Sequence, residues 1–204
     1  MDETDDDGWV AVTWSQPSQL NRNYALAGYD RTHNFSMGFL YDLPFMKTDT
    51  GAVAALVQNW QVNGVYQFYS GAPFTIAGDN TALNQRGGQQ TIQQVAPIRQ
   101  VGPAGPNAVY YDPASFAQPG NQWGNTGRNF LRGPTNYNLD MGIFRGFPIG
   151  RYRLEYRMTA SNILNHVRWG NPVTGFTDPN FMRIRTIAAS TGPRQIQMGL
   201  RFQF

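Results

Sequence analysis

Apolar and polar residues alternate without a break along the last ten residues of the chain. From Gln195 to Phe204 every even-numbered residue is apolar, and every odd-numbered residue is polar or glycine. A period of two places successive side chains on opposite faces of a β-strand. The run 151–161 places Tyr, Leu, Tyr, Met and Ala on one face and Arg, Glu, Thr and Ser on the other. Both runs predict strands with one apolar and one polar face.

Looser alternation extends this pattern to six predicted strands. The run from Trp9 to Trp14 has an ambiguous face, and the others alternate with few lapses. Strands of about 10 to 14 residues are longer than those of most globular sheets and can cross a bilayer when tilted. The predicted strands are 9–15, 32–45, 57–77, 135–148, 150–164 and 194–204.

The connections between these strands differ greatly in length. Residues 148–150 form a predicted tight turn, whereas 79–134 is a long polar segment rich in Gly, Pro, Gln and Asn. If the strands run up and down, the long connections share one side, and the tight turn and the C-terminus lie at the other. This asymmetry is typical of outer-membrane barrels, which have long extracellular loops and short periplasmic turns.

The same order brings aromatic residues together at the end with the tight turn. Amphipathic rings favour the boundary between membrane and water, so this cluster predicts an aromatic girdle. The alternative is that aromatic residues are common in any strand-rich protein. The girdle residues are Tyr41, Phe45, Trp60, Phe147, Tyr152, Phe202 and Phe204.

Three features favour a membrane barrel over a soluble β-sandwich, which would also alternate. The strands are long, the apolar face carries no charge except Arg145, and the chain ends on an aromatic residue inside its last strand. Arg145 lies near the tight turn, where an arginine can extend its head group to water. Closed single-chain barrels have at least about eight strands. The predicted fold is therefore all-β, with antiparallel up-and-down strands that form a partial transmembrane β-barrel.

Composition excludes several classes of function. The 204 residues include no cysteine, which removes disulfide frameworks, thiol nucleophiles and cysteine-ligated metals. No run of 18 apolar residues predicts a transmembrane helix, and no signal peptide is recognisable. Five of the 13 acidic residues lie within residues 1–8, a predicted disordered start that lacks the pattern of a calcium loop. The rest of the chain carries 16 basic residues against 8 acidic ones.

Candidate sites for chemistry are few. His33 and His166 lie far apart in the sequence without a carboxylate at ligand spacing, so no metal site is expected. The sequence contains no nucleophile elbow and no phosphate-binding loop. Nucleic-acid binding would place arginines and stacking rings on one face, whereas 151–161 separates them. We expect no enzyme, no cofactor and no nucleic-acid partner.

Glu155 lies between Arg153 and Arg157 on one predicted strand face, and this arrangement has two interpretations. It could bind an anionic or carboxylate-bearing ligand in a barrel lumen. It could also be a structural charge ladder that contacts a plug or neighbouring strands, and this second interpretation is the favoured one.

Five blocks of sequence carry a family likeness. They are 41–45 (YDLPF), 60–64 (WQVNG), 124–134 (GNTGRNFLRGP), 161–166 (SNILNH) and 193–204 (PRQIQMGLRFQF). In this order they resemble the C-terminal end of Oar-like TonB-dependent transporters, outer-membrane receptors with an N-terminal carboxypeptidase-regulatory-like domain. The likeness runs from about residue 9 to the end, so 9–204 would be a C-terminal barrel segment and 79–134 a long extracellular loop.

The resemblance implies a barrel of about 22 strands around a plug, of which this chain would supply roughly the last six. It implies nutrient uptake across the outer membrane of a Gram-negative cell, driven by the TonB complex acting on the plug. No plug or TonB box is recognisable in the chain, so we expect no transport by this chain alone. Phe204 matches the terminal aromatic residue that the barrel-assembly machinery recognises.

On this hypothesis each face of the sheet has its own partner. Outer-membrane lipid would cover the apolar face, and the lumen would adjoin the polar one. The lipid-facing residues would include Leu139, Met141, Leu154, Tyr156, Met158, Met198 and Leu200. The lumen-facing candidates are Arg153, Glu155, Arg157, Gln197, Arg201 and Gln203. The alternative is a soluble extracellular β-sandwich that binds carbohydrate through the loop aromatics Tyr110, Tyr111 and Trp123.

Overall fold

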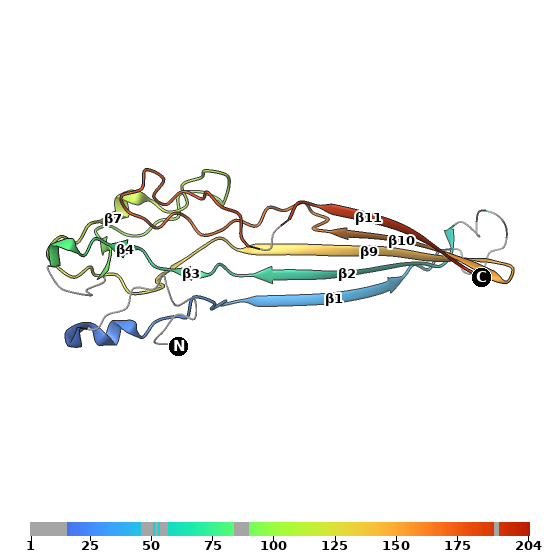
Figure 1. Cartoon of the computed structure of the whole chain (residues 1–204), viewed down its shortest axis with the longest axis horizontal. Helices are drawn as coiled ribbons and strands as arrows, with labels where there is room; N and C mark the ends of the chain where they lie inside the picture. The colour runs from blue at the N-terminus through green and yellow to red at the C-terminus, as the bar shows by residue number, and fades with distance from the viewer. Residues whose placement is uncertain (1–15, 46–50, 52, 54–56, 84–89, 190–191) are drawn as a thin grey trace. The chain divides into compact units, whose positions relative to one another are not determined.

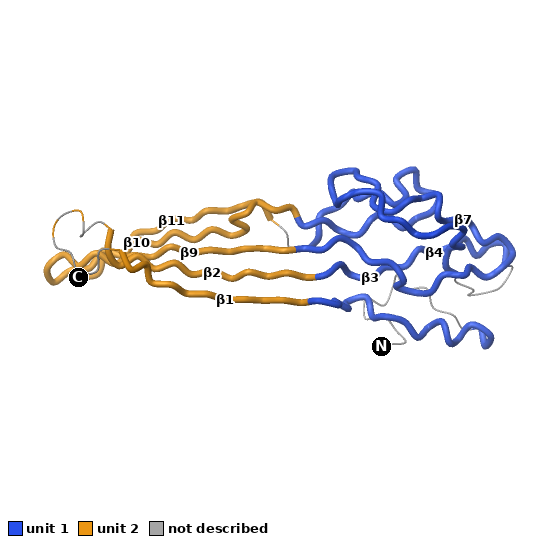
Figure 2. The backbone as a smooth tube through the Cα atoms, turned by 180° about the vertical axis from the view of Figure 1, so that it is seen from behind, with its two compact units in different colours: residues 1–33, 70–136, 168–189 blue, residues 34–69, 137–167, 190–204 orange. Residues whose placement is uncertain are grey.

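The chain forms two compact units, each assembled from three segments (Figure 2). A computed structural model describes residues 16–45, 51, 53, 57–83, 90–189 and 192–204. The predicted acidic start 1–8 and the predicted strand 9–15 lie outside the described residues. Unit 1 comprises residues 1–33, 70–136 and 168–189, and unit 2 comprises residues 34–69, 137–167 and 190–204.

Unit 2 is built on a five-stranded sheet in the order β1-β2-β9-β10-β11 (Figure 1). The pairs β1–β2, β9–β10 and β10–β11 are antiparallel. Trp60 lies near Arg145, and Gly64 lies near Asp140, so β2 and β9 also run in opposite directions. The strands are β1 (Asn34–Asp42), β2 (Trp60–Tyr69), β9 (Asn136–Ile149), β10 (Tyr152–Ser161) and β11 (Gln195–Gln203). The all-β, up-and-down prediction is confirmed.

The strand predicted at 57–77 is too long. It ends at Tyr69 as β2, and the pair Pro73–Phe74 forms β3 in a separate two-stranded sheet with β8 (Leu131–Arg132). Proline has no backbone N–H to donate to a ladder, which disfavours continuation of the regular β2 ladder through Pro73. Alternation alone did not show this interruption.

The tight turn between β9 and β10 lies later than predicted. β9 continues through Pro148 to Ile149, and the turn is formed by Gly150 and Arg151. Gly150 has a φ of 60°, in the left-handed region that glycine adopts without steric cost. Antiparallel pairing places this turn and the β1–β2 connection at one end of the sheet. The two long connections, 70–135 and 162–194, leave from the other end, as predicted.

The register gives the sheet one polar and one apolar face. Glu155 pairs with Arg201 on one side and Gly146 on the other, and residues paired in this way share a face. On the opposite face, Leu154 pairs with Phe202 and Phe147. Both faces are open along the edge strands, where all of β1 except Phe39 and all of β11 except Gln203 is exposed.

Unit 1 has a hydrophobic core of its own. Four of its side chains, Ile76, Ile92, Met182 and Ile184, have no exposed surface, and they lie in loops and turns outside the short strands. The core cluster comprises Phe74, Ile76, Ile92, Phe116, Leu131, Phe181 and Met182. Its remaining strands are β4 (Ala77–Gly78), β5 (Gln90–Thr91), β6 (Gln93–Gln94) and β7 (Phe116–Ala117), with 3-10 helices η1 (Pro17–Asn23), η2 (Thr81–Leu83) and η3 (Pro113–Ser115). The segment predicted as an extracellular loop is therefore packed.

Polar contacts hold the irregular backbone of unit 1 together. Arg132 forms an ion pair with Asp30 at 2.5 Å and also donates to the carbonyl of Gly71 at 3.2 Å. Thr91 and Thr126 are buried, and their hydroxyls donate to the carbonyls of Thr126 and Ile92 at 2.5 and 2.7 Å. Such contacts replace the regular ladders that the short strands lack. Among the described residues, no helix is both long and apolar enough to cross a membrane.

Truncation of Ile92 to alanine is expected to destabilise unit 1 by about 2–5 kcal/mol, because it leaves a cavity in the core. Urea titration of the full chain, followed by protease cleavage within 70–136, measures this loss. Val95→Ala is the control, since Val95 is 58% exposed and its truncation should change the free energy of unfolding little. Equal effects of the two changes would contradict a packed core around Ile92.

Candidate functional site on the two faces of the sheet

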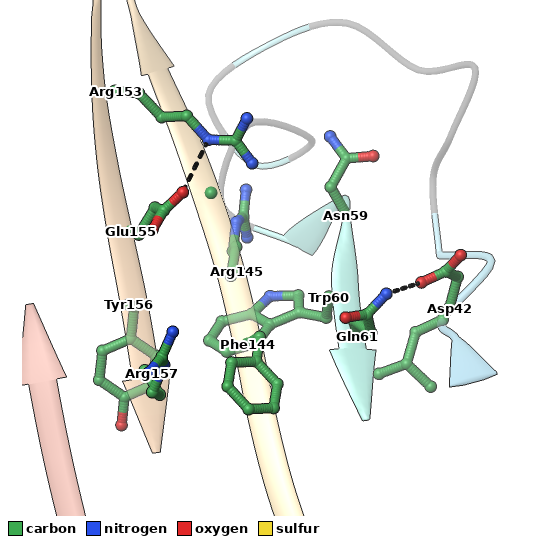
Figure 3. A pocket seen from close by; sticks show the side chains of 12 residues that line it. Asp42, Asn59, Trp60, Gln61, Phe144, Arg145, Arg153, Glu155, Tyr156 and Arg157 are labelled. Carbon is green, nitrogen blue, oxygen red and sulfur yellow. Dashed lines mark hydrogen bonds and ion pairs between the residues drawn. The ribbon is translucent and has the colours of Figure 1, made fainter. Parts of the chain in front are cut away.

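The structure brings the predicted lumen-facing residues together on the polar face of β10 and β11. Arg201 lies opposite Glu155, and Gln197 lies opposite Thr159. Arg153 contacts Glu155 through an ion pair, with 3.4 Å between Nε and Oε1 (Figure 3). The spacing of the three β10 residues in the sequence places them on one face. The register between β10 and β11 shows which β11 residues lie beside them.

A groove of about 410 Å³ opens between β10 and β2 across β9 (Figure 3). On its β10 side lie Arg153, Glu155 and Arg157, whereas Gln61 on β2 donates to Asp42 on β1 at 2.9 Å. Gln197 and Arg201 do not line it. The lining residues are Asp42, Leu43, Asn59, Trp60, Gln61, Phe144, Arg145, Gly146, Arg153, Glu155, Tyr156 and Arg157.

Two residues of β9 position the arginines of this groove. A Cβ atom on Gly146 would lie 2.7 Å from the Nη2 atom of Arg153, so the guanidinium lies in the space that glycine leaves. The Cζ atom of Arg157 lies 5.4 Å from the centre of the Phe144 ring, within cation–π range. Sequence analysis missed both β9 residues, because their role depends on the register between β9 and β10.

The apolar face carries large side chains that remain exposed. On β11, Met198 and Leu200 are 65% and 71% exposed, and on β1 Phe35 is 52% exposed. The central strands bury their apolar side chains only partly, with the exception of Ala160. Contiguous exposed apolar surface of this kind marks an interaction site. Within the described residues, no second protein layer seals this face.

Aromatic residues gather on the apolar face at the end with the tight turn. Tyr152 and Phe202 have ring centres 5.5 Å apart, and Trp60 and Tyr156 have ring centres 5.9 Å apart. Tyr41 pairs with Val62 one position from the same end. The predicted clustering at one end is therefore present in the described sheet.

Arg145 is covered by these rings instead of extending to solvent as predicted. Its Cζ atom lies 4.2 Å from the centre of the Phe147 ring and 5.4 Å from that of Trp60. The residue is only 5% exposed. The register explains the difference, because it places Tyr156 directly opposite Arg145 and Trp60 on the neighbouring strand. From its position in the sequence alone, Arg145 was the single charge on the apolar face, without neighbours to cover it.

The protein-family comparison agrees with this architecture. The model of the outer membrane beta barrel domain matches residues 1–197. The chain belongs to this family. Its location is therefore the outer membrane. No curated protein and no solved structure matched the chain.

Membership of the outer membrane beta barrel family overturns the alternative of a soluble carbohydrate-binding sandwich. Two of its three proposed stacking aromatics, Tyr110 and Tyr111, also lie in the wrong environment. Tyr110 is 7% exposed, and the Tyr111 hydroxyl donates to the carbonyl of Arg132 at 2.8 Å. Burial raises the pKa of both phenols. A ring that is covered in this way cannot stack on a sugar.

Neither histidine is part of a metal cluster among the described residues. The backbone N–H of His33 donates to the Ser70 hydroxyl at 3.0 Å, within unit 1. The His166 ring stacks on Tyr137, with 3.7 Å between ring centres, within unit 2.

Replacement of Arg145 by methionine is expected to destabilise the sheet by about 1–2 kcal/mol, because it removes two cation–π contacts in a desolvated site. Urea unfolding in detergent, followed by the β-sheet signal in circular dichroism, measures the change. Arg151→Met is the matched control, since Arg151 lies over Tyr152 at 5.0 Å in an exposed turn. Unchanged stability of the Arg145 variant would show that the ring contacts contribute nothing.

Proposed function

We propose that this barrel domain is the C-terminal part of a TonB-dependent outer-membrane transporter for energised nutrient uptake. The observation that carries a membrane role is the sheet with one exposed apolar face and one polar face. The narrower assignment is supported by the five ordered sequence blocks, among them 60–64 and 193–204. The proposed mechanism is binding outside the cell followed by plug movement, without an enzymatic step or a bound cofactor.

The proposed partners follow from the chemistry of the two faces and the edges. Hydrocarbon would cover the apolar face, and a plug would occupy the lumen beside the polar face. β1 and β11 each have a single neighbour in the described sheet, and unpaired backbone groups are costly in lipid. N-terminal barrel strands would therefore complete the barrel. Phe204 would be read by the barrel-assembly machinery, and the TonB complex would act only through the plug.

Unit 1 would lie outside the cell and capture the ligand. The long connections leave the sheet from the end opposite the tight turn, and long loops of outer-membrane barrels are extracellular. The packed core of unit 1 would give this loop a defined binding surface. Substrate specificity would depend on this surface and on the plug.

Replacement of Leu200 by arginine is expected to block membrane assembly, at about 2–4 kcal/mol at the bilayer midplane. Gln197→Arg on the same strand is the matched control, because its side chain points to the polar face. The measurement is retention in urea-washed membranes and extraction by detergent. A freely soluble, folded monomer, or equal retention of both variants, would refute a lipid-facing side.

The orientation of the sheet can be tested because the chain has no cysteine of its own. Val101→Cys, at a position 59% exposed in unit 1, should react with an impermeant maleimide on intact cells. Arg151→Cys in the tight turn should react only after the outer membrane is permeabilised. The reverse pattern of labelling would show that unit 1 faces the periplasm.

The TonB assignment has a separate test in the gene itself. The reading frame upstream of the Met1 codon should encode a signal sequence, a carboxypeptidase-like domain and a plug. The complete product should bind the purified periplasmic domain of TonB, whereas this chain alone should not. An upstream frame without a plug would contradict the transporter and leave the barrel membership intact.

A further inference from the structure

We propose that the groove lined by Arg153, Glu155 and Arg157 binds a small solute through its oxyanion group, a carboxylate or a phosphate. This inference deepens the proposed function, on which it rests, because it names the class of solute that passes the polar face. It also reverses the interpretation of this cluster as a purely structural charge ladder.

On β10 and β11 the polar face carries three guanidinium groups and one carboxylate, whereas Asp42, the other carboxylate that lines the groove, lies on the far side and accepts from Gln61. Arg153, Arg157 and Arg201 surround one carboxylate, that of Glu155, which pairs with Arg153. Within the part of the chain that the structure describes, neither Arg157 nor Arg201 has a carboxylate within salt-bridge distance. A ladder that served structure alone would pair each guanidinium with a carboxylate, whereas a guanidinium without a carboxylate beside it can attract an anion.

The arginines that line the groove are held before any ligand arrives. The Arg153 guanidinium occupies the space beside Gly146, where a Cβ atom would clash with it. The Arg157 guanidinium is held over the Phe144 ring. Planar guanidinium groups fixed in this way can donate paired hydrogen bonds to a carboxylate or a phosphate with little loss of entropy.

The size and chemistry of the groove fit a small solute. Its volume of about 410 Å³ lies within the usual range for ligand pockets, about 300–1,000 Å³. Phe144 contributes apolar surface on the polar face, and Gln61 adds an amide on the far side. The exposed guanidinium of Arg157 is accessible from the polar face. A plug segment is the alternative occupant, and the experiment below distinguishes it.

The test uses the full chain, extracted in nonionic detergent from outer membranes, with inorganic phosphate and citrate as probes. Calorimetry measures the binding of each probe. We expect saturable binding of at least one probe. The comparison between probes identifies whether phosphate or carboxylate is preferred.

Three variants assign the binding to the groove. Arg157→Gln should weaken it at least about tenfold, as expected for a lost charge-assisted bond. Gly146→Ala keeps every charge and should also weaken binding, because its methyl group displaces the Arg153 guanidinium. Arg151→Gln removes the same charge from the turn and should leave affinity unchanged. If Arg157→Gln fails to assemble, Gly146→Ala alone decides the question.

The remaining outcomes of the experiment each contradict a different claim. An assembled chain that binds neither probe, or that loses affinity equally with Arg151→Gln, refutes the oxyanion site and leaves the transporter proposal standing. An acidic peptide is tested in the same way as a stand-in for a plug segment. If the peptide binds and neither small anion does, the groove is assigned to a plug. A chain that is soluble and folded refutes the membrane proposal, whatever it binds.

Discussion

The structure depends on one constraint, that every backbone N–H and C=O of a membrane-spanning segment must find a partner within protein. Antiparallel pairing meets it across β1-β2-β9-β10-β11, and the same pairing fixes which side chains share a face. A slip of one residue would exchange the faces and carry Glu155 to the apolar side. The alternation in sequence therefore excludes registers shifted by an odd number of residues, which would exchange the faces. In the described sheet, β1 and β11 are the edge strands, and each pairs on one side only.

Arginine has two different roles on the two faces of this sheet. Arg145 lies among apolar neighbours, and rings of Trp60 and Phe147 surround its charge. Arg157 is exposed on the polar face, and a single ring beneath it holds its guanidinium in place. The planar guanidinium suits both environments because it stacks on rings and still presents donors at its edge. The same residue type thus contacts the girdle rings on one side and presents an exposed guanidinium on the other.

The long connections show how a loop can be ordered without long strands. Unit 1 has strands of two residues each, yet it buries Ile76, Ile92 and Met182 completely. Its backbone groups are satisfied by side-chain contacts such as that of Arg132 with Gly71. Such a unit presents a fixed surface, which the proposed capture of a ligand requires. Its Gly- and Pro-rich composition indicated a loop, but not a core.

The sequence by itself determined the strands, their faces and the end at which the aromatic residues gather, because a period of two is a local property of the chain. It also placed Arg153, Glu155 and Arg157 together, since they belong to one strand. Only the tertiary structure decided that β2 stops before Pro73, that rings cover Arg145, and that Gly146 and Phe144 hold the groove arginines. These features depend on which residues face one another across strands distant in sequence. No local pattern carries that pairing, because it is fixed when the ladders form.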